Sequence, residues 1–180
     1  MPGGVSFNRE SIARWVTPEC RKTMRLALYQ PDIPQNTGAL LRLGACLSVP
    51  IDIVEPCGFP IDDKRLRRAA MDYAVSCEIS RHASWVAYLA SFRANNHGRL
   101  ILLSTTATDS FSEFSYRPQD TLLLGRESAG VPTEVHNAVD SKVCIPMAPK
   151  ARSLNVVTAA AIVLGEALRQ QGRFAGNSAE

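Results

Sequence analysis

The stretch Thr121–Pro132, TLLLGRESAGVP, decides the fold of this chain. Its first four residues form a short apolar run, which is typical of a strand buried on both faces. Gly125 ends the run and Gly130 follows five residues later. Glycines so placed let backbone amides approach a ligand, or let the chain turn through positive φ. With the single carboxylate of Glu127 between them, they predict either a ligand site at a strand end or an ordinary strand-to-helix connection.

A second strand and its loop favour the ligand site. Lys142–Ile145 reads as a strand, residues 146–155 form a proline-braced loop, and a mostly apolar helix is predicted over Asn155–Gln171. Ser153 or Asn155 can cap this helix with a side-chain oxygen. Two adjacent strands that each end in a loop with exposed amides indicate the open end of an α/β sheet, where ligands bind.

The region further upstream opens with a strand, Arg25–Tyr29, and a proline-rich loop. Asn36 is a good N-cap residue for a helix predicted over Thr37–Leu47, whose leucines fall on one face. Arg42 lies on this helix among the leucines, six residues after Asn36. An arginine in such a position usually extends along the apolar surface to solvent, so the position alone indicates no function.

Strands and helices alternate through the middle of the chain. A helix is predicted over Trp85–Arg93, capped by Ser84 and carrying an aromatic stripe for the core. Further strands are predicted over Pro50–Val54, Cys77–Ile79 and Leu100–Leu103. With the three strands already described, they predict an α/β fold with a mostly parallel sheet and helices on both faces.

A helix predicted from Asp62 onward carries four cations within five residues, Lys64, Arg65, Arg67 and Arg68. Such a cluster is most often a solvated helix face. The predominance of arginine and the compactness of the cluster favour contact with phosphate, because a guanidinium matches phosphate geometry. The formal net charge of +3 adds little, since it does not by itself indicate a nucleic-acid partner.

The composition sets the class of protein. With 180 residues, 46% hydrophobic and 21% charged, the chain reads as one soluble domain. The longest uncharged run, Ser153–Gly165, is too short to span a bilayer and no signal segment is visible, so no membrane association is expected. Five cysteines without a CxxC spacing favour the reducing cytoplasm. The three histidines share no ligand spacing, so no metal is expected.

The two ends of the chain differ from its middle. Residues 1–23 lack hydrophobic periodicity, and we interpret them as an upstream extension, disordered or non-native, with a flexible basic arm as the alternative. The domain is predicted over residues 24–171, followed by a flexible tail over residues 172–180. From the residues alone, the predicted function is no narrower than an enzyme that binds a small ligand and a polyanion.

Three separated motifs point further when they are taken together. They are PQNTG at residues 34–38 with Arg42, GRESAG at residues 125–130, and IPM at residues 145–147 with RSLN at residues 152–155. This set resembles the signature motifs of the SPOUT RNA methyltransferases. Within that superfamily, the block EPCGFPIDDKRLRRAAMDY at residues 55–73 is similar to the TrmL type, the tRNA wobble-nucleotide 2′-O-methyltransferases. The resemblance covers Met24 to about Gln171.

The resemblance implies a fold, a cofactor and a reaction. The fold is a SPOUT fold with a C-terminal trefoil knot, which is rare among proteins, in a homodimer whose active sites lie near the subunit interface. The cofactor is S-adenosylmethionine. The reaction is methylation of the ribose 2′-oxygen of the wobble nucleotide, cytidine or a modified uridine, in the tRNA anticodon. The alternatives are methylation of another tRNA position or of rRNA, and a knotted RNA-binding protein without turnover.

Match of motif also implies the site residues. The cofactor would be bound by Leu103, Gly125, Gly130, Ile145, Met147 and Ser153. The catalytic group would comprise Asn36, Arg42 and Glu127, while Asn155 and the basic cluster would contact RNA. Because a guanidinium keeps its proton, we interpret Arg42 as a cation that fixes substrate phosphate and polarises the attacking hydroxyl, with water or a phosphate oxygen as proton acceptor. Two residues depart from the family pattern: Arg126, where relatives often have proline, and Gly165, where an aromatic residue is common.

Overall fold

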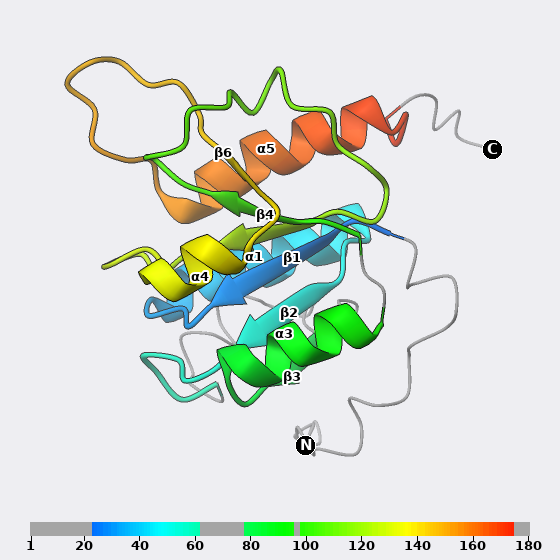
Figure 1. The fold of residues 1–180 in the computed structure, drawn as a ribbon, viewed down its shortest axis with the longest axis vertical. Helices are drawn as coiled ribbons and strands as arrows, with labels where there is room; N and C mark the ends of the chain where they lie inside the picture. Colours follow the sequence, from blue (N-terminus) through cyan, green and yellow to red (C-terminus); the bar gives the residue numbers. More distant parts are fainter. Residues whose placement is uncertain (1–22, 62–77, 96–97, 175–180) are drawn as a thin grey trace, which may run out of the picture.

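Six strands form one sheet in the order β3-β2-β1-β5-β4-β6 (Figure 1). The computed structural model describes residues 23–61, 78–95 and 98–174. The strands are β1 (Arg25–Tyr29), β2 (Ile51–Val54), β3 (Ile79–His82), β4 (Leu100–Leu103), β5 (Thr121–Leu124) and β6 (Ser141–Val143). Every neighbouring pair is parallel, which confirms the predicted α/β class. The helix predicted from Asp62 lies outside the described residues.

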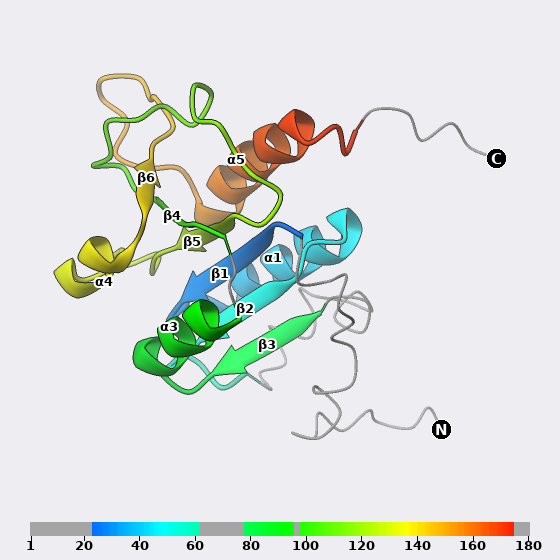
Figure 2. The same cartoon turned by 45° about the vertical axis from the view of Figure 1, so that its right-hand side comes forward.

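Helices cover both faces of the sheet, as predicted. They are α1 (Pro34–Leu47), α3 (Trp85–Ala94), α4 (Thr133–Ala138) and α5 (Val156–Gln170). Leu26 and Leu28 of β1 pack in one core with residues of α1 and α5, whereas Ala27 and Tyr29 pack in a second core with residues of α3 and α4. The alternation follows from the period of two residues in a strand. Figure 1 shows α3 and α4 in front of the sheet and α1 behind it, and Figure 2 shows β3 at the sheet edge.

Three strands have the predicted bounds and three do not. β2 begins at Ile51, one residue after the predicted Pro50. β1, β4 and β5 lie where their apolar runs predict them. β6 ends at Val143 instead of Ile145, because beyond Val143 the chain pairs only through a single bridge between Cys144 and Ser110. β3 lies mostly beyond the predicted Cys77–Ile79, since its sequence ISRH is polar and only partly buried at the edge of the sheet. An edge strand of that kind has no apolar run to mark it.

The helix starts also include one wrong prediction. Asn36 is not the N-cap of α1: the cap position is Ile33, and Pro34 is the first helical residue. Proline suits that position because its missing N–H has no partner there in any case. Ser84 and Asn155 do cap α3 and α5, accepting hydrogen bonds from Ala87 and Val157. The earlier start of α1 leaves the Asn36 side chain available for the site described below.

A buried ion pair lies between β1 and β2, on the strands that support the site. Nε and Nη2 of Arg25 donate to the two carboxylate oxygens of Asp52 at 3.0 and 2.9 Å, and both residues are 5% exposed. Burial opposes ionisation of Asp52, but contacts with His82 and Arg25 hold its pKa below the ordinary value. Because breaking such a pair leaves a buried charge without compensation, we expect this pair to matter for stability.

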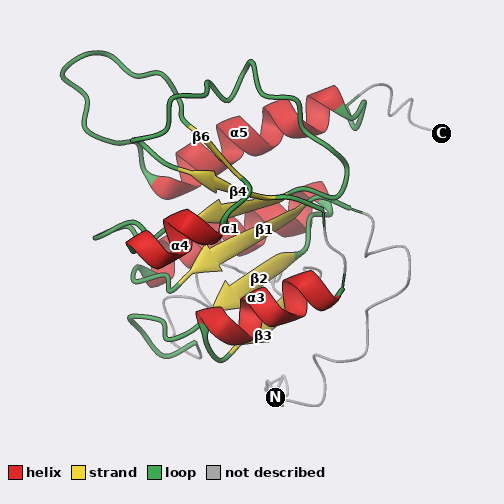
Figure 3. Cartoon of the chain, viewed as in Figure 1, coloured by secondary structure: helices red, strands yellow, loops and turns green. Residues whose placement is uncertain are grey.

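Two long loops lie together at one end of the sheet. One connects β4 to β5 and the other connects β6 to α5, and both are drawn in green near the top of Figure 3. The bridge between Ser110 and Cys144 joins them.

Within the described ranges, no helix is long and apolar enough to cross a membrane. The missed helix α4 has only six residues, too few for helical periodicity to be visible in the sequence.

Candidate active site

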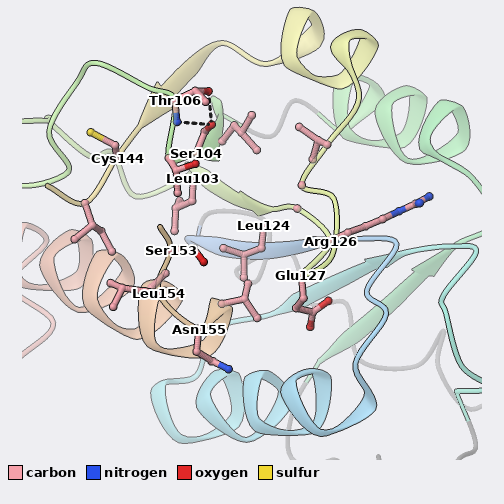
Figure 4. Close-up of a pocket in the computed structure, with 18 of the residues that line it drawn as sticks. Leu103, Ser104, Thr106, Leu124, Arg126, Glu127, Cys144, Ser153, Leu154 and Asn155 are labelled. Atoms are coloured by element: carbon pink, nitrogen blue, oxygen red, sulfur yellow. Dashed lines mark hydrogen bonds between the residues drawn. The ribbon is translucent and has the colours of Figure 1, made fainter. Parts of the chain in front are cut away.

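A cavity of about 580 Å³ lies at the carboxyl ends of β4, β5 and β6. Its walls are the loops that follow these strands, the segment Ser153–Asn155 before α5, and Asn36 from the first turn of α1 (Figure 4). Parallel strands place all of their carboxyl ends at one edge, so loops far apart in sequence converge there. The ligand site predicted from the glycine stretch is therefore a cavity in the structure.

The six residues implied for the cofactor all line this cavity. They are Leu103, Gly125, Gly130, Ile145, Met147 and Ser153. The cavity is also lined by residues outside these six, namely Ser104, Thr106, Arg126, His136, Cys144 and Leu154, of which Arg126 and Leu154 lie within the quoted motifs. His136 belongs to the missed helix α4, whereas the others flank predicted positions. A signal for these flanking residues existed, because each follows a strand end or precedes a helix start.

The glycine loop, residues 125–130, owes its shape to its two glycines. Backbone hydrogen bonds join Arg126 and Gly130 in both directions at 2.9 Å. A Cβ atom on Gly125 would lie 2.8 Å from the carbonyl carbon of Gly130, and Gly130 itself has φ of +64°. A side chain at Gly125 would open the closure, and one at Gly130 would strain the backbone. The stretch is therefore a connection after β5 that also forms part of the wall of the cavity.

A chain of polar side chains links three sequence motifs beside the cavity. Nδ2 of Asn36 donates to Oε1 of Glu127 at 3.2 Å, and Nδ2 of Asn155 donates to Oδ1 of Asn36 at 3.2 Å. Oδ1 of Asn155 accepts from the backbone of Val157 at 2.8 Å, which is the cap of α5. Figure 4 shows Glu127 and Asn155 both pointing toward α1. The structure thus brings Asn36, Glu127 and Asn155 together.

Asp32 completes this cluster and was missed by the sequence analysis. Its backbone N–H donates to Oε2 of Glu127 at 3.1 Å, and the backbone N–H of Glu127 donates to Oδ1 of Asp32 at 3.2 Å. Ser128 donates its backbone N–H at 3.3 Å, and its hydroxyl as well, to Oδ2 of Asp32. Burial and the Asp32 carboxyl raise the pKa of Glu127, while hydrogen bonds from Glu127 and Ser128 lower the pKa of Asp32.

The structure does not bring Arg42 to this cluster within one chain. Arg42 is exposed on α1 and is not among the residues that line the cavity. Six residues along a helix correspond to about 9 Å and about 600° of rotation, so Asn36 and Arg42 face different directions. The basic cluster predicted to contact RNA, Lys64, Arg65, Arg67 and Arg68, lies outside the described residues.

Arg126, one of the two departures from the family pattern, has a structural explanation. Its guanidinium lies 5.8 Å from the centre of the Tyr29 ring, within the range of a cation–π contact. In Figure 4 its side chain points away from the other labelled residues. Tyr29 in turn packs edge-on against Trp85. The contact ties the glycine loop to the end of β1.

No group of three or more His, Cys, Asp or Glu side chains in the described ranges is arranged to bind a metal ion. What the fold and the site define is an α/β domain with a cavity at the carboxyl ends of a parallel sheet, next to a carboxylate–amide cluster. The chain belongs to the SpoU rRNA Methylase family, whose family model matches residues 23–165. The resemblance drawn from the three motifs is confirmed, and so is the α/β fold with a parallel sheet and helices on both faces; the trefoil knot stays a prediction.

The three relatives that follow all concern the methylation of RNA. A protein of Beijerinckia indica called tRNA (cytidine(34)-2′-O)-methyltransferase is 56% identical over 150 residues, 83% of this chain and 93% of its own. A solved structure concerning the 2-OH methylation of C/U34 on tRNA is 35% identical, with a TM-score of 0.78, over 84% of this chain and 97% of that one. An AdoMet-bound rRNA methyltransferase from Sinorhizobium meliloti is 25% identical, with a TM-score of 0.76, over 83% and 57%.

Proposed function

We propose that this chain transfers a methyl group from S-adenosylmethionine to the ribose 2′-oxygen of the wobble nucleotide of tRNA, cytidine or a modified uridine. The observation that carries the proposal is the meeting of Asn36, Glu127 and Asn155, from three motifs, in the wall of one cavity. The relative from Beijerinckia indica, at 56% identity, is called by the name of that activity. The enzyme would work in the cytoplasm, where its tRNA substrate is.

The cavity suits a cofactor of this size and chemistry. Its volume of about 580 Å³ lies within the range of small-molecule sites, roughly 300–1,000 Å³. Leu103, Ile145 and Met147 supply apolar wall, and the tight closure at Gly125 and Gly130 leaves backbone groups beside the space. The AdoMet-bound relative shares the fold. When bound, S-adenosylmethionine supplies an electrophilic methyl group on a sulfonium.

The residues of this chain would then position the acceptor ribose. Methyl transfer needs an in-line approach of the 2′-oxygen and loss of the hydroxyl proton, and positioning alone supplies much of such an acceleration. The carboxylate of Glu127 has about four lone-pair positions, of which Asp32 and Asn36 occupy two. The remaining positions can accept the ribose hydroxyl. Arg42 keeps its proton, so its role is that of a cation toward substrate phosphate.

We further propose that the protein is a homodimer built through α1 and α5. These helices contact one another, and α5 leaves Ile162 with 38% of its surface exposed. Space is open beside Gly165 on the same helix, since a Cβ there would meet no heavy atom within 4 Å. A second subunit against α1 would also cover the exposed Arg42 face. Sedimentation at micromolar concentration should give about twice 19.6 kDa; a monomer that methylates tRNA would contradict the dimer.

The deciding experiment maps the methyl group. Purified protein, labelled S-adenosylmethionine and tRNA transcripts with cytidine at position 34, the position in the name of the relative, are incubated and the product nucleotide is identified. A matched transcript carries 2′-deoxycytidine at that position, which removes only the acceptor hydroxyl. Labelling of the first transcript and not of the second supports the proposal. Equal labelling of both would indicate another tRNA position, and labelling of rRNA instead or of neither RNA would favour the alternative functions.

A further inference from the structure

Asp32 is fixed from the side opposite the glycine loop. The backbone N–H of Gly58, in the loop after β2, donates to the carbonyl oxygen of Pro31 at 2.9 Å. A Cβ atom on Gly58 would lie 2.9 Å from both Cα and Cβ of Asp32, so the two backbones are in direct contact. Asp32 is therefore held between the loop after β2 and the loop after β5.

The chemistry of the contact requires a carboxylate at Asp32. Two backbone N–H groups and one hydroxyl from Glu127 and Ser128 converge on its two oxygens. An ionised carboxylate offers only acceptors, whereas the amide of asparagine would turn an N–H₂ group toward these donors. A carboxylate that accepts several such bonds is stabilised in its charged form. Asparagine at this position would leave at least one backbone donor without its partner.

From this geometry we infer that Asp32 is a positioning residue for the methyl transfer, an inference that rests on the proposed function. The Asp32 side chain fixes the backbone of Glu127, and the Asp32 backbone fixes the side chain of Glu127. Both the backbone and the side chain of Glu127 are thereby fixed relative to Asn36 and the first turn of α1. The hydrogen bonds of Asp32 thus connect the glycine loop, which is a wall of the cofactor cavity, to the first turn of α1, which orients the ribose. We call this set of hydrogen bonds the Asp32 lock.

Two substitutions disturb this lock by different routes. Asp32→Asn keeps the shape of the side chain and removes the charge and one acceptor. Gly58→Ala keeps every group of the lock but pushes a methyl group into the backbone of Asp32. Each should lower the single-turnover rate at saturating cofactor and tRNA by about 10- to 100-fold, because misplacement of a reacting group by about 1 Å has effects of that size. The KM for tRNA should change by less than about threefold, since no contact made equally in ground and transition state is lost.

Double variants separate positioning from a general loss of stability. If Asp32 acts through Glu127, then Asp32→Asn combined with Glu127→Gln should be no more than about threefold slower than the slower single variant. Gly58→Ala should be non-additive with Asp32→Asn for the same reason. Effects that multiply would overturn the inference, as would an Asp32→Asn rate within about twofold of wild type. Glu113→Gln, at an exposed residue that does not line the cavity, is the matched control and should leave the rate unchanged.

A measurement without tRNA distinguishes this inference from the proposed function. In Asp32→Asn, the backbone amides of Glu127 and Ser128 should exchange with solvent at least about tenfold faster, while the amide of Leu123 in β5 should not change. Unchanged exchange of both amides would overturn the lock, whatever the activity. If the wild-type protein transfers no methyl group to tRNA but Asp32→Asn shows the faster exchange, the proposed function is overturned and the link between Asp32 and Glu127 stands.

Discussion

The closure of the glycine loop makes a quantitative prediction for Gly125→Ala. The added Cβ would lie 2.8 Å from the carbonyl carbon of Gly130, whereas ordinary carbon contacts begin at about 3.5 Å. Gly130 must therefore move by roughly 0.7 Å, the difference between these two distances. Both hydrogen bonds that join it to Arg126 are 2.9 Å long and would lengthen beyond the range of a hydrogen bond.

The loss of this closure should weaken cofactor binding by a predictable amount. Each backbone hydrogen bond contributes about 1 kcal/mol, so holding the loop closed in the variant costs about 2 kcal/mol. If the closed loop is the form that binds, the dissociation constant for S-adenosylmethionine rises about 30-fold. Isothermal titration calorimetry measures it directly, with a thermal melt to show that the fold persists.

Gly165→Ala is the matched control for this measurement. It makes the same chemical change at a glycine whose Cβ would meet no heavy atom within 4 Å. Its cofactor affinity should equal that of wild type, and its helix should gain up to about 1 kcal/mol because alanine is the better helix former. Wild-type affinity in Gly125→Ala would refute the reasoning, since it would show that the closure of the loop is irrelevant to the cofactor.

Three further predictions test other parts of the site and fold. Arg42→Lys and Arg42→Ala should both lower the single-turnover rate by about 100-fold with cofactor affinity unchanged, because an electrostatic contact used in the transition state is worth about 3 kcal/mol; recovery with lysine would show that charge without the guanidinium geometry suffices. Reversal of Arg65 and Arg68 to glutamate should lower the log–log salt slope of tRNA binding by about two units, and an unaltered slope would mean a solvated face. Asp52→Asn should destabilise the fold by about 3–5 kcal/mol in urea titrations at pH 7. Because the folded-state pKa of Asp52 is lowered, its contribution is full above its unfolded pKa of about 4 and is lost as the pH falls through the folded value, so the difference from wild type should shrink in acid and not in base.

Much of the fold was predictable because buried parallel strands leave a direct trace in the sequence. β1, β4 and β5 are short apolar runs bounded by polar or glycine residues, and each was predicted with its observed bounds. β3 was misplaced because it is an edge strand, for which polar residues are tolerated. α4 was missed because six residues cannot show a helical period. Elements that bury little apolar surface were therefore the ones that the pattern could not predict.

The residues of the site also divide into those that the sequence could predict and those that it could not. The place of Gly125 at the cavity was predictable because it directly follows a strand and parallel strands place their carboxyl ends at one edge. Met147, beyond the end of β6, was indicated only by match of motif. The position of Asn36 one residue before the predicted helix indicated a cap, whereas match of motif placed it in the catalytic group. The structure shows that α1 starts at Pro34 and that the Asn36 side chain turns to Glu127. The sequence did not indicate a role for Asp32, because its partner Glu127 lies 95 residues away and a contact at that separation produces no periodic pattern in the sequence.

The electrostatics of Glu127 bear directly on its role in the proposed reaction. Burial and the Asp32 carboxyl raise its pKa, whereas the donor from Asn36 favours its ionised form. The net result is that Glu127 has a higher proton affinity than an ordinary glutamate, and the hydrogen bonds that it accepts use only part of its acceptor capacity. Arg42 has the opposite character, because it cannot release a proton near neutral pH. In the proposed reaction, Glu127 therefore receives the hydrogen bond of the ribose hydroxyl and Arg42 supplies fixed positive charge. The two roles are separable by experiment, since Glu127→Gln removes the proton affinity without adding or removing a side-chain atom position.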